Sequence, residues 1–108
     1  MLKKSQRLDR RLFTQYFNQG KRNHSTYTTI ISVPYKDFLV AIVVGKKVFK
    51  QAHERNNIKR QVSSVIEEIK KSKDVKGVYI VILKPAIAKL TKREIREVIN
   101  KEVGLVMK

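Results

Sequence analysis

Hydrophobic residues at intervals of three and four predict a long amphipathic helix in the middle of the chain. Its buried stripe consists of Ile58, Val62, Val65, Ile66 and Ile69. Four polar or charged residues fall outside this stripe and are expected on the exposed side: Asn56, Lys59, Arg60 and Ser63. One face of the helix is therefore predicted to pack on a core, and another to meet solvent or a partner.

Two further helices are predicted, one towards each end of the chain. The first extends from about Arg10 to Gln19, with Asp9 as its N-cap and Gly20 as its C-terminal stop. The last opens with a capping box at residues 91–94, in the order Thr, Lys, Arg, Glu. Its apolar stripe consists of Ile95, Val98, Ile99, Val103 and Val106.

Extended segments lie between these helices. Residues 27–33 are rich in β-branched and aromatic side chains, and residues 34–37 supply a turn. The apolar run from Phe38 to Val44 predicts a strand buried on both faces or central in a sheet. A second apolar strand, residues 78–83, is expected beside it, and a short strand fits between residues 21 and 26. The predicted fold class is α+β, a sandwich of helices against a small mixed sheet.

The chain is strongly basic. Lys and Arg number 25 against nine Asp and Glu, which gives a net charge of +16 over 108 residues. Solubility alone requires far less charge, so a polyanionic partner is the default inference. Hydrophobic residues make up 42% of the chain, which is enough to fill a core. We therefore expect a single nucleic-acid-binding domain over residues 1–108.

Many of the cations gather where the apolar run ends at Gly45 and the long helix begins. They are Lys46, Lys47, Lys50, Arg55, Lys59 and Arg60, with Asn56 between them. Lys and Arg present donors that match phosphate oxygens, and Asn can bond sugar hydroxyls or base edges. A basic helix face can also be merely solvated surface. Continuity with Lys46 and Lys47, together with the net charge, favours a surface that binds phosphates.

The first predicted helix carries a second candidate surface. Its apolar stripe consists of Leu12, Phe13, Tyr16 and Phe17. On residue type alone, packing of this stripe into the core is the stronger interpretation. However, four cations flank it, at Arg10, Arg11, Lys21 and Arg22, and aromatic faces beside cations form stacking platforms for unpaired bases. The sequence supports both interpretations.

The sequence shows no chemistry for unaided catalysis. There is no Cys, and the two histidines, His24 and His53, lie in no metal-ligand spacing. Capping and ion pairing on helices account for the scattered acidic residues, and no Gly-rich phosphate loop occurs. The N-terminus lacks the apolar core of a signal peptide, and no apolar run is long enough to span a membrane. Cytoplasmic residence is the simplest interpretation.

Several blocks of sequence, taken in order, point to a known family. Residues 45–60 read GKKVFKQAHERNNIKR, and Phe13, Phe17 and Gly20 form a Phe-x-x-x-Phe-x-x-Gly motif. Residues 79–95 read as a strand, a Lys-Pro exit and a final helix. This arrangement resembles the bacterial ribonuclease P protein subunit, in which a strand ending in Ser-Lys-Lys-Val is followed by an Arg-Asn-Arg-x-Lys-Arg helix. The resemblance covers nearly the whole chain.

Three positions depart from the family's pattern. Gly45 stands in place of the strand-end serine, Asn57 in place of an arginine, and Ser63 where a further arginine is frequent. The first two departures remove a hydroxyl and a charge from the expected RNA face. They are consistent with a diverged member of the family.

The resemblance implies a fold of order α-β-β-β-α-β-α, a two-layer sandwich whose four-stranded mixed sheet contains a left-handed βαβ crossover. It implies that the protein binds a large catalytic RNA and the 5′ leader of precursor tRNA. The ribonucleoprotein is an endoribonuclease that removes the leader to give the mature 5′ end, and the RNA performs the hydrolysis with Mg²⁺. The protein would act as a monomer within this complex, without a catalytic residue, metal ligand or organic cofactor of its own.

The resemblance also assigns roles to residues. Seven of them are expected to contact RNA and to help organise nearby metal ions: Lys46, Lys47, Lys50, Arg55, Asn56, Lys59 and Arg60. Phe13 and Phe17 are expected to line a cleft between the first helix and the sheet, which holds the single-stranded leader.

Other functions are compatible with parts of this pattern. A structural RNA-binding protein of the ribosomal type would share the charge and the aromatic platform, but it would not distinguish precursor from mature tRNA. A DNA-binding module fits less well, because no helix-turn-helix spacing is evident and stacking on unpaired bases favours RNA. Charge as a surface adaptation alone would leave the ordered motifs unexplained.

Overall fold

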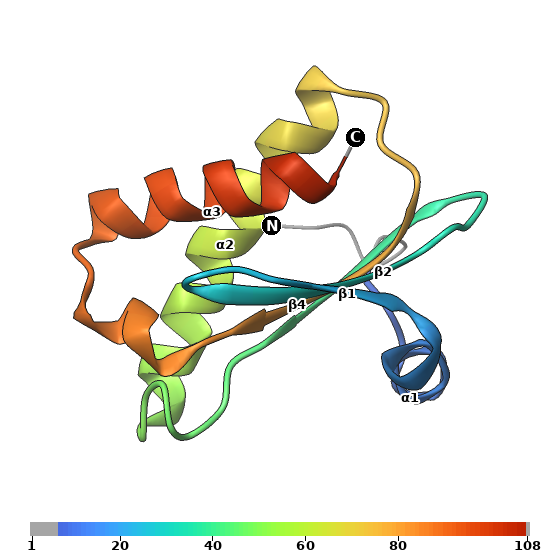
Figure 1. The fold of residues 1–108 in the computed structure, drawn as a ribbon. Helices are drawn as coiled ribbons and strands as arrows, with labels where there is room; N and C mark the ends of the chain where they lie inside the picture. The colour runs from blue at the N-terminus through green and yellow to red at the C-terminus, as the bar shows by residue number, and fades with distance from the viewer. Residues whose placement is uncertain (1–6, 108) are drawn as a thin grey trace.

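A four-stranded sheet separates two long helices from a short one in the computed structural model, which describes residues 7–107 (Figure 1). The strands are β1 (Lys21–His24), β2 (Thr28–Val33), β3 (Phe38–Val43) and β4 (Gly77–Leu83). The helices are α1 (Arg10–Gln19), α2 (Ala52–Ser72) and α3 (Lys92–Val106), with the short 3-10 helix η2 (Pro85–Lys89) before α3. Helices α2 and α3 cover one face of the sheet, and α1 lies against the other.

The strand order in the sheet is β1-β2-β4-β3. Strand β2 is antiparallel to both of its neighbours, whereas β3 and β4 are parallel. Helix α2 connects this parallel pair, and the crossover agrees with the expected left-handed connection. The α+β class, the element order and the mixed four-stranded sheet are therefore confirmed.

Strand β3 lies at an edge of the sheet, so the prediction that this apolar run is central or buried on both faces is wrong. Phe38 and Val40 are buried on the side of the main core, but Leu39, Ala41 and Val43 are only half-buried on the opposite face. The strand buried along nearly its whole length is β4, which lies between β2 and β3 and in which only Ile82 is half-buried. An apolar run predicts that a strand is buried, but it does not show which other elements bury it.

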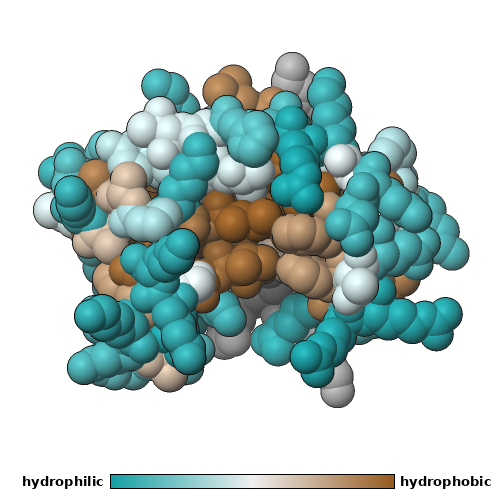
Figure 2. All heavy atoms as spheres, turned by 60° about the horizontal axis from the view of Figure 1, so that its bottom comes forward, coloured by the Kyte–Doolittle hydropathy of each residue, from teal (hydrophilic) through white to brown (hydrophobic). Residues whose placement is uncertain are grey.

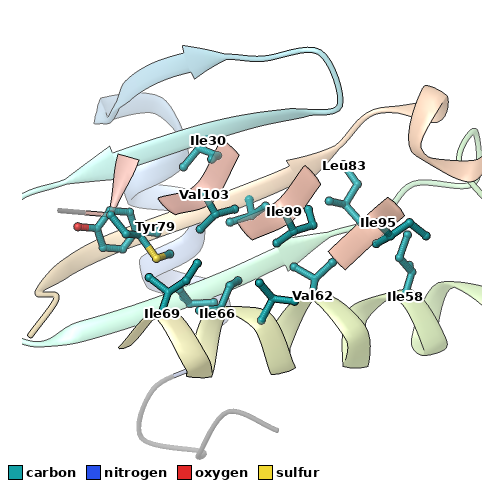
Figure 3. Close-up of a cluster of buried hydrophobic side chains, with 14 of the residues drawn as sticks. Ile30, Ile58, Val62, Ile66, Ile69, Tyr79, Leu83, Ile95, Ile99 and Val103 are labelled. Carbon is teal, nitrogen blue, oxygen red and sulfur yellow. The ribbon is translucent and has the colours of Figure 1, made fainter. Parts of the chain in front are cut away.

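The main core lies between the sheet and helices α2 and α3 (Figure 3). Ile30, Tyr79 and Leu83 of the sheet face the apolar stripes of the two helices. The stripe predicted for α2 is buried throughout, whereas in α3 Val98 and Val106 are half-buried. Each fully buried Ile or Val side chain stabilises the fold by roughly 1.5–3 kcal/mol, so this layer fixes the orientation of both helices.

Both predicted helix starts are confirmed by their hydrogen bonds. The Asp9 carboxylate accepts from Leu12 N–H at 2.8 Å. Thr91 Oγ1 accepts from Glu94 N–H at 3.2 Å, and Thr91 N–H donates to Glu94 Oε1 at 2.9 Å. The backbone hydrogen bond from Thr91 holds the pKa of the Glu94 carboxyl below its ordinary value. These caps fix where α1 and α3 begin.

Gly20 ends α1 at a close approach to β2. Its φ of −76° is ordinary for any residue, so a left-handed stop is not the reason for glycine here. A Cβ at this position would lie 2.2 Å from Ile31 Cγ2 and 3.1 Å from Ser32 O. The absence of a side chain therefore lets the end of α1 pack directly on the sheet.

Replacing Gly20 with alanine should destabilise the protein by about 1–3 kcal/mol, because the added methyl group must displace α1 or Ile31. Urea denaturation measures this change. Gly104→Ala is the matched control, because a Cβ there meets nothing within 4 Å and alanine favours the helix. Equal stability of the parent protein and the Gly20 variant would contradict the close packing of α1.

Candidate nucleic-acid interface

A tight turn between β3 and α2 presents Lys46 and Lys47 to solvent. Val48 N–H donates to Gly45 O at 3.1 Å, and the Val48 side chain is buried at 8% exposure. The sequence suggested that the two lysines lie at the end of the strand. Strand β3 ends at Val43, however, so both lysines lie on the turn. Anchoring by Val48 holds both charges at the tip.

Arg55 holds the segment that joins this turn to α2. Its Nη1 donates to Phe49 O at 3.0 Å and to Lys50 O at 2.8 Å, and its side chain is half-buried. A guanidinium has five N–H donors, so other donors remain for an anion while Nη1 serves the two carbonyls. Arg55 thus fixes the position of the exposed Lys50. This structural role is independent of any contact between Arg55 and a ligand.

Replacing Arg55 with alanine should lower the free energy of unfolding by about 1–3 kcal/mol, because two carbonyls, of which that of Phe49 is partly buried, lose a charged donor. The exposed Lys59 makes no such bond to any of residues 7–107, so Lys59→Ala is the control and should change stability by less than about 0.5 kcal/mol. Thermal unfolding of the two variants measures the difference. Equal melting temperatures would show that Arg55 does not hold this segment.

A groove of about 410 Å³ lies between the outer edge of β3 and α2. We call it the edge groove. The strand contributes Val40, Ala41 and Ile42 to its lining, and the helix contributes Asn56, Lys59, Arg60 and Ser63. Three of the residues predicted to contact RNA thus lie together, and all three are exposed. Such a groove can hold an anionic backbone between a strand edge and a row of donors.

Two residues of the edge groove differ from expectation. Ser63 was expected on the exposed side but is only 8% exposed, because its small side chain lies where α2 packs beside β3. Arg7, which the sequence analysis did not select, also lines the groove. Backbone pairing brings Arg7 there, because it forms an isolated parallel β-bridge with Val40 and the next residue, Leu8, donates its N–H to Val40 O at 3.0 Å. No periodicity marks this pairing in the sequence.

The selected cations have no carboxylate partners within residues 7–107. The ion pairs in that range join Lys70 to Asp74, Arg93 to Glu97 and Arg96 to Glu68. Five of the selected cations therefore have no directly paired acid in that range: Lys46, Lys47, Lys50, Lys59 and Arg60. A field of one sign over a groove concentrates anions there, which solvated mixed-charge surface does not do.

Helix α1 carries its aromatic rings on the second face of the sheet, outside the main core. None of its residues is fully buried, so the stripe does not enter the main core, although its half-buried side chains lie on the helix that packs against the sheet. Phe13 and Phe17 lie in contact, with ring centroids 5.6 Å apart. The Arg22 guanidinium carbon lies 4.9 Å from the Phe17 centroid, and Arg22 Nη2 also donates to Phe17 O at 3.1 Å. The rings and the cation form one partly exposed cluster.

Beside α1, part of the sheet is open. Ile31 and Ile80, on the face that α1 covers, have no exposed surface. On β3 and β4, four apolar residues of the same face are half-buried, and we call them the open sheet face: Leu39, Ala41, Val43 and Ile82. Figure 2 shows apolar side chains in the middle of this side of the molecule, bordered by hydrophilic ones. The placement of Phe13 and Phe17 against a leader stays a prediction.

Residues 7–107 contain no group of three or more His, Cys, Asp or Glu side chains that could hold a metal ion. His24 and His53 are both exposed, and His24 Nδ1 lies 3.2 Å from Thr29 Oγ1. None of the helices in this range is long and apolar enough to cross a membrane.

Comparison with known proteins gives one family and one fold. The family described as Ribonuclease P matches residues 2–105 of the chain. A Staphylococcus aureus RNase P protein mutant with defective mRNA degradation activity has a TM-score of 0.77 at 23% identity, covering 95% of this chain and 89% of that one. Another structure of S. aureus RNase P protein has a TM-score of 0.76 at 21% identity, with 100% and 96% covered.

A third similar structure is RNase P protein from Thermotoga maritima in complex with 1-(4-fluorophenyl)-2-thiourea. It has a TM-score of 0.68 at 27% identity, covering 82% of this chain and 87% of that one. A comparison with curated proteins finds no match.

Proposed function

The chain belongs to the ribonuclease P protein family, and from this premise we propose that it binds a catalytic RNA together with the 5′ leader of precursor tRNA. In this proposal the RNA cuts the precursor at the mature 5′ end with Mg²⁺ that it binds itself. The protein adds affinity for RNA and for substrate, as a monomer in a cytoplasmic ribonucleoprotein.

One observation carries this proposal: β3 places two surfaces of different chemistry side by side. Its outer edge forms the edge groove with Asn56, Lys59 and Arg60, and its second face contributes most of the open sheet face. Phosphate contacts position a folded RNA without reading its sequence, whereas apolar and aromatic surface accepts unpaired bases. A partner that is folded in one part and single-stranded in another suits this pair of surfaces.

The cations also account for an effect on the metal requirement. The catalytic RNA and precursor tRNA are both polyanions, and their association is opposed by charge repulsion that Mg²⁺ relieves at high concentration. Unpaired cations such as Lys46, Lys47 and Lys59 offset part of this repulsion. We therefore expect the protein to matter most at low Mg²⁺.

Cleavage of a 5′-labelled precursor tRNA by a bacterial ribonuclease P RNA tests the proposal. At low Mg²⁺, cleavage at the mature 5′ end should require the protein, and at high Mg²⁺ it should become less dependent on it. Mature tRNA serves as the competitor for substrate binding. Tight RNA binding without stimulation, repeated with the cognate RNA, would overturn the proposal in favour of a structural RNA-binding protein.

A further inference from the structure

Two adjoining hollows lie between α2 and α3, on a face of α2 that neighbours the edge groove. One, of about 280 Å³, is lined by Arg60, Gln61, Ser64, Lys92 and Arg96. The other, of about 190 Å³, has an apolar wall of Phe49, Ile58 and Ile95, and its polar lining includes Asn57 and the carboxylate-bearing Glu54. They share Gln61 and Lys92, and we call them together the interhelical groove.

The first hollow is cationic. Arg60 and Lys92 are exposed and have no carboxylate within ion-pair distance among residues 7–107. Arg96 pairs with Glu68 across the two helices through one of its nitrogens, and its other donors are not used by that pair. Three cations converge on this hollow, and within residues 7–107 Glu68 is the one acid paired with them, while Glu54 lines the adjoining hollow. The hollow therefore suits an anion such as a phosphate.

Gln61 adds a second requirement for the ligand. Its Oε1 is buried and has no hydrogen-bond partner in the described part of the chain. Buried side-chain acceptors are nearly always satisfied in folded proteins. Gln61 lines both hollows, so a rotation of its side chain into the groove would let this oxygen accept a hydrogen bond from a ligand. The phosphodiester of an RNA strand has no such donor, but a ribose hydroxyl does. Phosphate and hydroxyl together point to a ribonucleotide.

The second hollow fits the remaining part of a nucleotide. The ring of Phe49 and the side chains of Ile58 and Ile95 offer apolar contact, and the Asn57 amide can bond a base edge. Asn57 is one of the departures from the family's motif, and the structure places it here and not in the edge groove. A base in this hollow must be unpaired, because the faces of a base inside a duplex are covered by the neighbouring base pairs and cannot contact the Phe49 ring.

We propose that the interhelical groove binds an unpaired nucleotide of the partner RNA. The phosphate lies against Arg60, Lys92 and Arg96, and the ribose 2′-hydroxyl donates to Gln61 Oε1. The base lies towards Phe49. Arg60 lines both this groove and the edge groove, so one RNA strand can continue across α2 from one to the other. This inference rests on the proposed function and adds a second contact site for the same RNA.

The first test measures binding of a bacterial ribonuclease P RNA to the full chain as a function of salt. Replacing Lys92 and Arg96 with glutamine should lower the slope of log affinity against log salt by between about 1 and 2, because two phosphate contacts are lost. Lys89→Gln with Lys101→Gln is the control, since it removes the same charge from exposed positions outside the groove. Equal slopes for the two double variants would overturn the inference.

The second test uses Gln61→Met, which keeps the length of the side chain but removes the buried acceptor. Affinity for a single-stranded RNA should fall about 3- to 10-fold, with an unchanged salt slope, because no charge is lost. The preference for this RNA over DNA of the same sequence should fall by the same factor. The melting temperature should not fall, because an unsatisfied oxygen is removed. If Gln61→Met binds RNA as tightly as the parent protein and keeps the same preference for RNA over DNA, Gln61 does not contact the ribose.

The two tests separate failure of this inference from failure of the proposed function. If the parent protein stimulates cleavage but the groove variants bind like their controls, only the interhelical groove is excluded as an RNA site. If the parent protein binds RNA without stimulating cleavage, the proposed function fails. A lower salt slope for Lys92→Gln with Arg96→Gln would in that case still support the groove.

Discussion

Replacing Lys59 and Arg60 together with alanine should reduce affinity for a ribonuclease P RNA by ~30-fold at 150 mM salt. Both side chains are exposed, line the edge groove and have no carboxylate partner within residues 7–107. Each phosphate contact contributes about 0.9 to the slope of log affinity against log salt, which corresponds to ~5-fold at this salt concentration. Two lost contacts therefore lower the slope by about 1.8 and the affinity by the product of the two factors.

A filter-binding or fluorescence titration between 50 and 300 mM salt measures this effect. Lys71→Ala with Lys73→Ala is the control, because these exposed lysines lie at the other end of α2 and line neither the edge groove nor the interhelical groove. The control removes the same net charge, so it reports the long-range effect of charge alone. If both double variants lose affinity equally, the edge groove is not the contact surface.

The helices and their caps were predictable from the sequence because their signals are local. The stripe of α2, the Asp9 cap and the Thr91 capping box all depend on residues within a few positions of each other. The edge position of β3 was not predictable in this way. An apolar run shows that a strand needs cover, but the cover comes from segments distant in sequence, here from α2 and residues 7–8.

The buried carboxylate of Glu102 shows the same limit. It accepts a hydrogen bond from Thr28 Oγ1 at 2.7 Å and lies 3.3 Å from Tyr27 N, so it joins α3 to the start of β2. Its partners are more than 70 positions away in the sequence. On a helix that carries several charged residues, no spacing distinguishes this glutamate from an exposed one. Only the packing of α3 on the sheet identifies it.

The candidate site was predictable in composition but not in arrangement. The basic segment identified Asn56, Lys59 and Arg60, and the structure brings these three into one groove. It gives Arg55 a structural role in the preceding segment, and it places Asn57 beside α3. Neighbours in sequence thus face different surfaces, because successive residues of a helix are about 100° apart. Sequence motifs name candidate residues, but the helix divides them between grooves.

Replacing Phe13 with alanine should weaken binding of precursor tRNA more than binding of mature tRNA, by roughly 1–3 kcal/mol, if the ring stacks on a leader base. The Phe13 ring is half-buried and lies outside the main core, in contact with the Phe17 ring. The Arg22 guanidinium lies over the ring of Phe17. A stacked base needs an aromatic face of this kind beside a cation. The ribonucleoprotein with bacterial ribonuclease P RNA is the form in which both affinities should be measured.

Two further variants distinguish stacking from packing at Phe13. Phe13→Leu keeps apolar bulk against the sheet but removes the aromatic face, so it should retain stability and still lose the preference for precursor tRNA. Tyr16→Ala removes a half-buried ring of the same helix whose contact is with Tyr35, at a centroid distance of 6.1 Å. It should lower the melting temperature without changing that preference. Equal losses for precursor and mature tRNA in Phe13→Ala, with a lower melting temperature, would assign the ring to packing alone, since a leader base affects only the precursor.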